Sequence, residues 1–360
     1  MLPKKIIFFA VLLAACLNAY ESEAGIVFAR DGQYAIISET DYSIVKTGDL
    51  WEDFKTKLDP SMKEEFFAEY GVRLILEVTP DMERNRFFVC TGLPAEDVFD
   101  GCFALKYPEM DFLGLIKQGG PFVVNPSGKK MYKGGSVYDN TTFAELNNYE
   151  DAIYKLPTID PGDFYEDKAF RISKDACFID EKRLFTSGRV FDISTAPPTF
   201  LYNPGILYDI GPGDDCINEK VLNFGSVNAE ETLQEYSILD LLTSKEIGRV
   251  TMPYDKYPES IGDYFLSKDI KYIISDVRNE ANSFAGILRF YDIASNTLKA
   301  EIKLPIPEVD SAVGRLGLSK SGDLLFYKTG GDKLFVISVK DTKLLKKLIL
   351  PFEPDEVIWP

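Results

Sequence analysis

Short runs of apolar residues alternate with polar turns along most of this chain. Typical runs are Lys271–Ser275 and Leu334–Ser338, which are rich in β-branched and aromatic residues. Such side chains suit a pleated surface and favour strands over helices. The pattern therefore predicts a recurring unit: an apolar strand, a polar turn, a second strand, and a third strand that ends in a short charged turn.

The polar turn of this unit recurs seven times, and successive copies lie 38 to 54 residues apart. A repeat of this length is typical of propellers and other repeat arrays. The clearest copies are Phe28–Tyr34, Val124–Lys130, Phe265–Tyr272 and Leu318–Leu324. The seven marker residues are Asp31, Asp81, Ser127, Glu181, Glu219, Asp269 and Gly322.

A second marker repeats in step with the first. It is an apolar pair followed by Asp or Ser, which precedes a turn and another strand. Its copies begin at Val137, Val190, Ile238, Phe290 and Val336. Because two independent markers share one period, the repeat is a property of the fold and not of one turn type.

A four-stranded sheet cannot bury both of its faces alone, whereas radial stacking buries each face against the next blade. The turn and the later Asp resemble the "SPDG-x-x-x-YV" and "V-x-D-x-x-T" elements of seven-bladed propellers of the YVTN-like and WD40-like group. The resemblance spans Ile26 to Trp359, is strongest after Glu231 and is weakest between Asp49 and Asp180. The Trp-Asp and Gly-His signatures of WD40 repeats are missing, so the resemblance implies architecture only, because many functions share this fold.

The predicted fold is thus an all-β propeller of about seven four-stranded blades, forming a single domain over residues 25–360. We expect the ring to close by pairing strands within Ile26–Lys46 with a strand near Val357-Ile358-Trp359, since an open edge invites aggregation. Residues 49–70 interrupt the pattern with apolar residues at helical spacing, which predicts a short helical insertion near 50–70. That insertion is either a helix-capped blade connection or a lid that binds a partner.

The N-terminus has the layout of a secretory signal peptide over residues 1–24. Lys4 and Lys5 precede an apolar run from Ile6 to Leu13, which is too short to span a bilayer. Leu13-Ala14-Ala15-Cys16 resembles a bacterial lipobox, which predicts lipidation of Cys16. The alternative is ordinary cleavage at Ala19 or after Ala24. The chain is therefore expected to be exported, as a periplasmic or cell-surface lipoprotein or as a freely secreted protein.

Four cysteines remain once Cys16 is set aside, and an oxidising compartment permits disulfides. Cys90 and Cys102 flank a segment with turn residues, which predicts a bridge across one hairpin. Cys177 and Cys216 are separated by nearly one repeat, which predicts a second bridge between successive blades. The alternative is that all four are buried reduced thiols.

Charge and composition exclude several classes of function. The formal net charge is −17, with 57 acidic against 40 basic residues, so nucleic acid is an unfavourable partner. By the same reasoning the whole chain is expected to meet a membrane only through a lipid anchor. The chain has no histidine, which excludes Ser-His-Asp and Cys-His catalysis and His-ligated metal or haem sites.

Few residues indicate a specific chemistry. Asp214 and Asp215 lie on a glycine-rich turn and could bind Ca²⁺ through oxygen ligands, but they lack the spaced carboxylates of an EF-hand loop, so a solvated turn is favoured. No other cofactor is predicted. Asn140-Thr141-Thr142 fits a glycosylation sequon, which matters only for a chain exported by a eukaryote.

These observations favour a non-catalytic binding or scaffold propeller that presents a loop face to a protein or small ligand. The alternative is a His-independent hydrolase or lyase that uses Asp, Glu, Tyr or Lys at the central channel. The sequence does not decide between these classes, although the lack of catalytic motifs favours binding.

Overall fold

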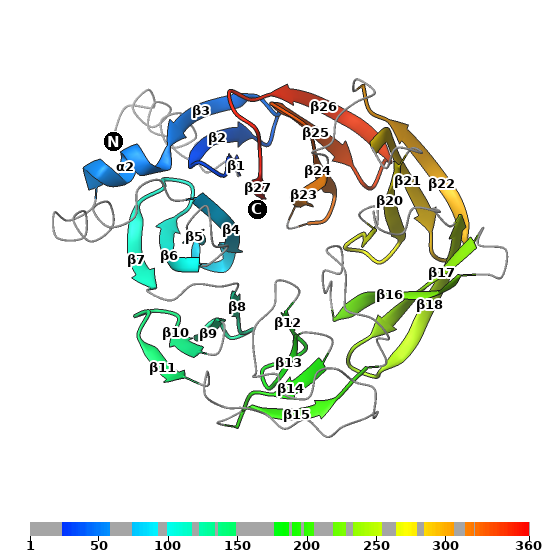
Figure 1. Cartoon of the computed structure of the whole chain (residues 1–360), viewed down its shortest axis with the longest axis horizontal. Helices are drawn as coiled ribbons and strands as arrows, with labels where there is room; N and C mark the ends of the chain where they lie inside the picture. The colour runs from blue at the N-terminus through cyan, green and yellow to red at the C-terminus, as the bar shows by residue number, and fades with distance from the viewer. Residues whose placement is uncertain are drawn as a thin grey trace, which may run out of the picture.

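The computed structural model describes residues 24–57, 74–92, 99–116, 122–133, 136–148, 176–186, 189–195, 198–204, 219–227, 233–253, 264–278, 284–305, 314–319 and 321–359. These residues form seven antiparallel sheets arranged as the blades of a β-propeller (Figure 1). Six sheets have four strands, and the fifth has three strands among the described residues. The predicted all-β, seven-bladed architecture is therefore confirmed.

Strands are numbered along the chain, and within each blade they follow one another from the centre of the ring outwards. Blades 1 and 2 consist of β27 (Glu356–Ile358), β1 (Ala24–Phe28), β2 (Gln33–Ser38) and β3 (Ile44–Asp49), and of β4 (Leu74–Asp81), β5 (Arg86–Gly92), β6 (Phe99–Lys106) and β7 (Phe112–Ile116), with a 3₁₀ turn η1 (Met82–Arg84) after β4. Blades 3 and 4 consist of β8 (Phe122–Val124), β9 (Lys130–Lys133), β10 (Ser136–Asp139) and β11 (Glu145–Asn148), and of β12 (Cys177–Phe178), β13 (Arg183–Thr186), β14 (Arg189–Asp192) and β15 (Thr199–Tyr202). Blades 5, 6 and 7 consist of β16 (Lys220–Val227), β17 (Leu233–Asp240) and β18 (Lys245–Pro253), of β19 (Phe265–Leu266), β20 (Tyr272–Arg278), β21 (Phe284–Asp292) and β22 (Thr297–Lys303), and of β23 (Gly314–Leu318), β24 (Leu324–Thr329), β25 (Lys333–Ser338) and β26 (Lys343–Ile349).

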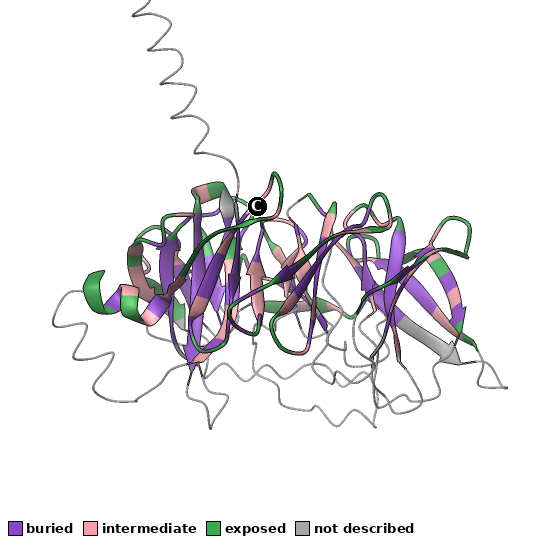
Figure 2. Cartoon of the chain, turned by 90° about the horizontal axis from the view of Figure 1, so that it is seen from above, coloured by how far each residue is buried: buried purple, intermediate pink, exposed green. Residues whose placement is uncertain are grey.

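Alternating side chains of each blade face opposite neighbours, as the two-residue period of a strand requires. In β25, Phe335 and Ile337 join the apolar cluster shared with blade 6, whereas Leu334 and Val336 join the cluster shared with blade 1. Every junction between adjacent blades contains one such cluster. Buried residues accordingly follow the strands, and exposed residues gather at the turns (Figure 2).

The ring closes as predicted, with the C-terminal strand β27 pairing antiparallel to β1. Val27 lies opposite Val357 in this pairing. Trp359 then packs on Phe326 of blade 7 and Tyr42 of blade 1, with ring centroids 4.6 and 6.1 Å apart. Gly25 leaves room for the indole, since a Cβ there would come within 1.9 Å of it. The last residues of the described chain therefore join blades 7 and 1.

The turn around Asp31 differs from the prediction. In blades 2, 3, 4, 6 and 7 the marker turn joins the first and second strands, whereas in blade 1 it joins β1 to β2, the second and third strands. The physical reason is ring closure, because the innermost strand of blade 1 comes from the other end of the chain. The second marker series lies on the third strand, counted outwards, in blades 3, 4, 6 and 7.

The predicted helical insertion contains the helix α2 (Leu50–Lys57). Asp49 caps it by accepting hydrogen bonds from the backbone N–H groups of Trp51 and Glu52, at 2.9 and 3.1 Å. Leu50 and Phe54 are fully buried in the cluster between blades 1 and 2. The described helix is therefore a packed blade connection, and residues 58–70 of the predicted insertion lie outside the described residues. Among the described helices, none is long and apolar enough to cross a membrane.

Candidate functional site

The propeller has two faces with different construction. The turn face is defined as the side that carries the turns between the first and second strands and between the third and fourth strands of each blade. The connection face is the opposite side, where second strands end and third strands begin. Because neighbouring strands are antiparallel, these turns alternate between the two faces along every blade.

On the turn face, side chains of the chain itself satisfy the backbone of the turns. Asp139 Oδ1 accepts from the N–H groups of Thr141 and Thr142 at 2.9 and 2.7 Å, and Asp292 Oδ1 accepts from Ser295 at 2.8 Å. These hydrogen bonds hold the pKa of both carboxyl groups below the ordinary value, because they stabilise the charged form. The second sequence marker is therefore a turn-forming device.

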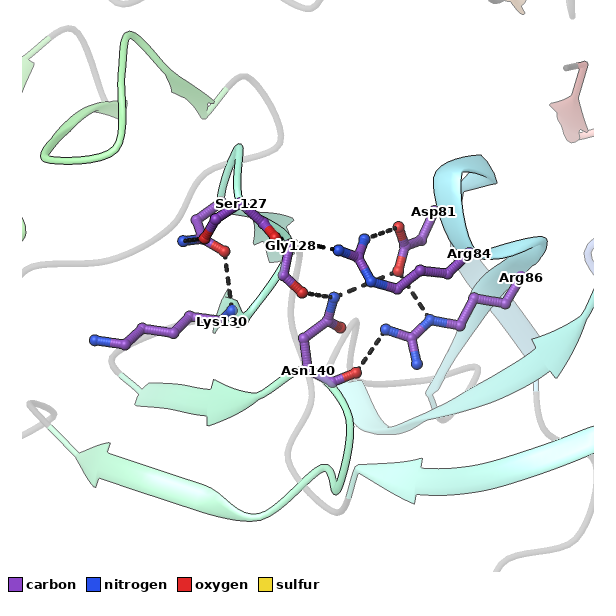
Figure 3. A network of polar contacts seen from close by, with 8 residues as sticks. Asp81, Arg84, Arg86, Ser127, Gly128, Lys130 and Asn140 are labelled. Carbon is purple, nitrogen blue, oxygen red and sulfur yellow. Dashed lines mark hydrogen bonds and ion pairs between the residues drawn. The ribbon is translucent and has the colours of Figure 1, made fainter.

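The turn-face end of the junction between blades 2 and 3 holds a buried ion-pair network (Figure 3). Arg86 Nε donates to Asp81 Oδ2 at 2.8 Å, and an Arg86 terminal nitrogen donates to the Asn140 carbonyl at 2.6 Å. Arg84 pairs with Asp81 Oδ1 at 2.8 Å. The Asn140 side chain donates to the carbonyl of Gly128 at 2.8 Å. Charges in this network are mutually satisfied, so it joins blades and is not an open site.

Asn140 is fully buried in this network, and its side-chain nitrogen already donates a hydrogen bond. A glycan must attach to that nitrogen and needs solvent around it. The geometry therefore contradicts use of the Asn140-Thr141-Thr142 sequon in the folded protein.

Buried polar residues occur on the second strands of blades 2, 3, 4, 6 and 7, and on β16 of blade 5. Asn223 donates to Ser237 Oγ at 3.3 Å, and Thr91 donates to the Gly101 carbonyl at 3.4 Å. Among the described residues, Lys133 Nζ and Thr329 Oγ1 have no hydrogen-bond partner. Besides Arg86, the buried polar residues of these strands are Thr91, Lys133, Thr186, Asn223, Ser275, Asp276 and Thr329.

Lys133 is the most unusual of these groups. It is the last residue of β9, and only 2% of it is exposed. Burial lowers its pKa from 10.5 to about 7, and the charge of Glu77 on β4 opposes this shift. Glu77 itself accepts a hydrogen bond from Thr79 Oγ1 at 3.0 Å. A lysine in this environment can donate to an oxygen acceptor or, when neutral, accept a proton.

A second buried ionisable group, Asp276, lies between blades 6 and 7. Tyr327 donates its hydroxyl to Asp276 Oδ2 at 3.0 Å, and Asp276 is 4% exposed. Like Lys133, Asp276 is on a second strand near the connection face. Buried ionisable groups, Lys133 and Asp276, thus occur under this face at two separate junctions.

The sequence did not single out Lys133, Glu77 or Asp276. A lysine at a strand end before two glycines has the pattern of an exposed turn, and only the neighbouring blade buries it. The sequence does contain one signal for Lys133. The strands that begin with Lys130, Arg183 and Lys220 each carry a polar residue three positions later.

The predicted disulfide between Cys90 and Cys102 is confirmed. The two residues lie opposite each other on β5 and β6, with Cα atoms 4.0 Å apart, and both are fully buried. Cys177 on β12 is also disulfide-bonded. Its predicted partner Cys216 lies outside the described residues, so that pairing stays a prediction.

The other predicted site residues, Cys16, Asp214 and Asp215, also lie outside the described residues. Within the described ranges, no group of three or more acidic or cysteine side chains could hold a metal ion. The calcium prediction therefore stays a prediction.

The sequence matches no protein-family model and no curated protein. Its fold does resemble solved structures. "Dihydro-heme d1 dehydrogenase NirN in complex with DHE" aligns over 93% of this chain and 75% of that chain, with a TM-score of 0.51 and 10% identity. The Cps50 (Swd1) β-propeller domain of Myceliophteria thermophila aligns over 78% and 88%, with a TM-score of 0.45 and 11% identity. The computationally designed Ika8 protein aligns over 93% and 89%, with a TM-score of 0.49 and 11% identity.

At these identities the likeness shows the fold alone. The class of this protein is therefore a seven-bladed β-propeller, and any ligand has to be inferred from its own residues.

Proposed function

We propose that this chain is an exported, non-catalytic binding propeller that holds its ligand at the connection face, with Lys133 as a main polar contact. The observation that carries the proposal is the buried Lys133 Nζ, which has no hydrogen-bond partner within the described part of the chain. An unsatisfied buried polar group costs about 1 to 3 kcal/mol, and more when it is charged. Such a cost is typical of functional sites, where a ligand relieves it.

The chemistry of Lys133 defines the ligand class. An ammonium group has three donors and no acceptor, so its complement is an oxygen acceptor such as a carboxylate or a carbonyl. Small carboxylates and the backbone or side chains of a peptide both present this group. The disulfide between Cys90 and Cys102 supports export, because disulfides persist in oxidising compartments.

Thermal unfolding with a panel of amino acids, sugar acids and short peptides tests this function. A ligand should raise the Tm of the wild type and leave Lys133→Met unchanged. Lys130→Met is the matched control, because Lys130 is exposed at the opposite end of the same strand. Equal stabilisation of all three proteins would place the ligand elsewhere and contradict the proposal.

The alternative function is a hydrolase or lyase, and one observation favours it. A lysine with a pKa of about 7 under the influence of a carboxylate suits proton transfer near neutral pH. Turnover of lactone, glycan or amine substrates, lost in Lys133→Met and kept in Lys130→Met, would establish this function in place of simple binding. Metal-stripped and calcium-loaded protein should be compared in the same assay, since Asp214 and Asp215 are the proposed calcium ligands.

Anchoring through Cys16 is part of the proposal. We expect Cys16→Ser to lower the fraction of exported protein that stays on the membrane of a bacterial host after a high-salt wash, because stable anchoring requires the acyl chains. Wild-type protein that is already soluble after export would favour free secretion.

A further inference from the structure

The outermost strands of blades 6, 7 and 1 carry a concentration of positive charge. These strands, β22, β26 and β3, follow one another around the rim of the ring (Figure 1). Their exposed charged side chains are six lysines and one glutamate. They are Lys46, Lys299, Lys303, Lys343, Lys346, Lys347 and Glu301.

The other four outer strands lack this excess. The exposed charged residues of β7, β11, β15 and β18 are two basic and two acidic side chains. They are Lys245, Arg249, Glu145 and Glu246. In a chain with a net charge of −17, the basic residues of the rim are thus concentrated on three consecutive blades.

Protection of open edges does not explain this distribution. Lysines on an edge strand do hinder pairing with other chains. However, all seven outer strands end their sheets, and β7 and β15 contain no charged residue. A protective role would apply to every edge, so the concentration on three blades indicates a further role.

These lysines are largely available to an external partner. Lys343 lies 3.3 Å from Asp341, but Lys299, Lys303, Lys346 and Lys347 form no ion pair within the described part of the chain. Lys46 lies 5.6 Å from the ring centre of Tyr34. Lys346 and Lys299 also act electrostatically on Asp41 and Asp292, but without an ion pair, so the positive charge of these strands is only partly neutralised within the described part of the chain.

Exposed aliphatic residues accompany the lysines on the same three strands. Val45 is 64% exposed, Ile349 is 54% exposed and Leu298 is 48% exposed. Lysines together with exposed aliphatic side chains are typical of surfaces that rest in the headgroup region of a bilayer. The long lysine stems suit this place because they can extend towards the phosphates.

We propose that the basic rim, defined as the exposed surface of β22, β26 and β3, docks onto the anionic headgroups of a phospholipid bilayer. The rim is convex, so it fits an extended flat partner better than a small ligand. The net negative charge of the whole chain predicts repulsion from an anionic bilayer. However, charges separated by more than about 10 Å are screened at 0.1 M salt, so the local arrangement of charges governs the contact. The proposal depends neither on a lipid at Cys16 nor on the ligand at the connection face.

Vesicle co-sedimentation tests the proposal, with the exported protein carrying Cys16→Ser so that no lipid anchor contributes. Vesicles of phosphatidylcholine alone are compared with vesicles that also contain phosphatidylglycerol. We expect binding only to the anionic vesicles, and a fall as salt increases. The triple variant K343E/K346E/K347E should bind about a hundredfold more weakly, because each lysine near an anionic surface contributes about fivefold.

The matched control is K129E/K130E/K182E, which makes the same charge change at three exposed lysines of blades 3 and 4. It should keep most of the binding. Equal losses in both triple variants would show a net-charge effect and overturn the proposal, as would equal wild-type binding to both kinds of vesicle. Binding of soluble polyglutamate but not vesicles, lost in the rim variant, would assign the surface to an acidic protein instead. Replacing Val45 and Ile349 with Ser should weaken vesicle binding that persists at high salt, and no change would contradict the headgroup contact.

Discussion

The buried charged groups at the two ends of the junction between blades 2 and 3 differ in their hydrogen bonding. At the turn-face end, the charged groups of Asp81 and Arg86 pair with each other and bond to Asn140 of the facing blade. At the connection-face end, Lys133 is also buried, but its Nζ has no hydrogen-bond partner among the described residues. Burial alone therefore does not identify a binding site. A buried charge that is paired and hydrogen-bonded joins blades, whereas one without a hydrogen-bond partner is available to a ligand.

The largest effect on stability is expected from removing the buried ion pair at the turn-face end of the junction. Arg86→Met should lower the free energy of unfolding by about 3 to 5 kcal/mol, because Asp81 is left buried with fewer partners. Urea unfolding measures this. Arg84→Met is the control, since Arg84 is more exposed and its loss leaves the Arg86 pair intact. Equal losses in the two variants would show that the network does not depend on burial.

The disulfide of blade 2 lies in the apolar cluster of the same junction. Replacing Cys90 and Cys102 together with Ala should lower the free energy of unfolding by about 2 to 4 kcal/mol, because the unfolded chain gains conformational freedom. Thermal and urea unfolding of the double variant measure the change. An unchanged stability would contradict a structural role for the bond.

Thiol titration extends this test to the second predicted bridge. The denatured, unreduced Cys16→Ser protein should have no free thiol if Cys177 pairs with Cys216. Two free thiols would leave only the bridge between Cys90 and Cys102.

Buried Lys133 should make the free energy of unfolding depend on pH. Lys133 has a pKa of about 7 in the folded protein against 10.5 for an ordinary lysine, so the unfolded state binds more protons between these values. The stability contribution of Lys133 should therefore increase with pH by up to about 1.4 kcal/mol per pH unit, or roughly 2 kcal/mol from pH 7 to 9. Urea unfolding across this range should show the slope in the wild type and lose it in Lys133→Met. A slope that persists in the variant would come from other groups.

The smallest effect is expected at a single turn. Partial burial would raise the pKa of Asp240, but hydrogen bonds from Thr243 and from Lys220 lower it overall. A lowered carboxyl pKa stabilises the fold at neutral pH, and this contribution is lost as the pH falls through the folded-state pKa. Asp240→Ala should therefore cost about 1 kcal/mol at pH 7 and less at pH 3. A cost that does not change with pH would contradict the role of the charge.

The architecture could be predicted from the sequence because each repeat is defined by residues that are close together along the chain. Turn residues and the Asp that ends the third strand recur with each blade, and they form the same turn each time. The position of the Asp31 turn within its blade could not be predicted, since it depends on β27 arriving from the far end of the chain. Lys133 was missed for a related reason: its burial comes from blade 2, and its own neighbours along the chain resemble an exposed turn.

The most direct test of the difference between the two ends is the titration of Lys133 itself. NMR of protein carrying ¹³C at lysine Cε follows each ammonium group through pH. We expect one lysine that titrates near pH 7 in the wild type and is absent from Lys133→Met. If every lysine of the wild type titrated near 10, Lys133 would be solvated or satisfied, and the proposed contact at the connection face would be wrong.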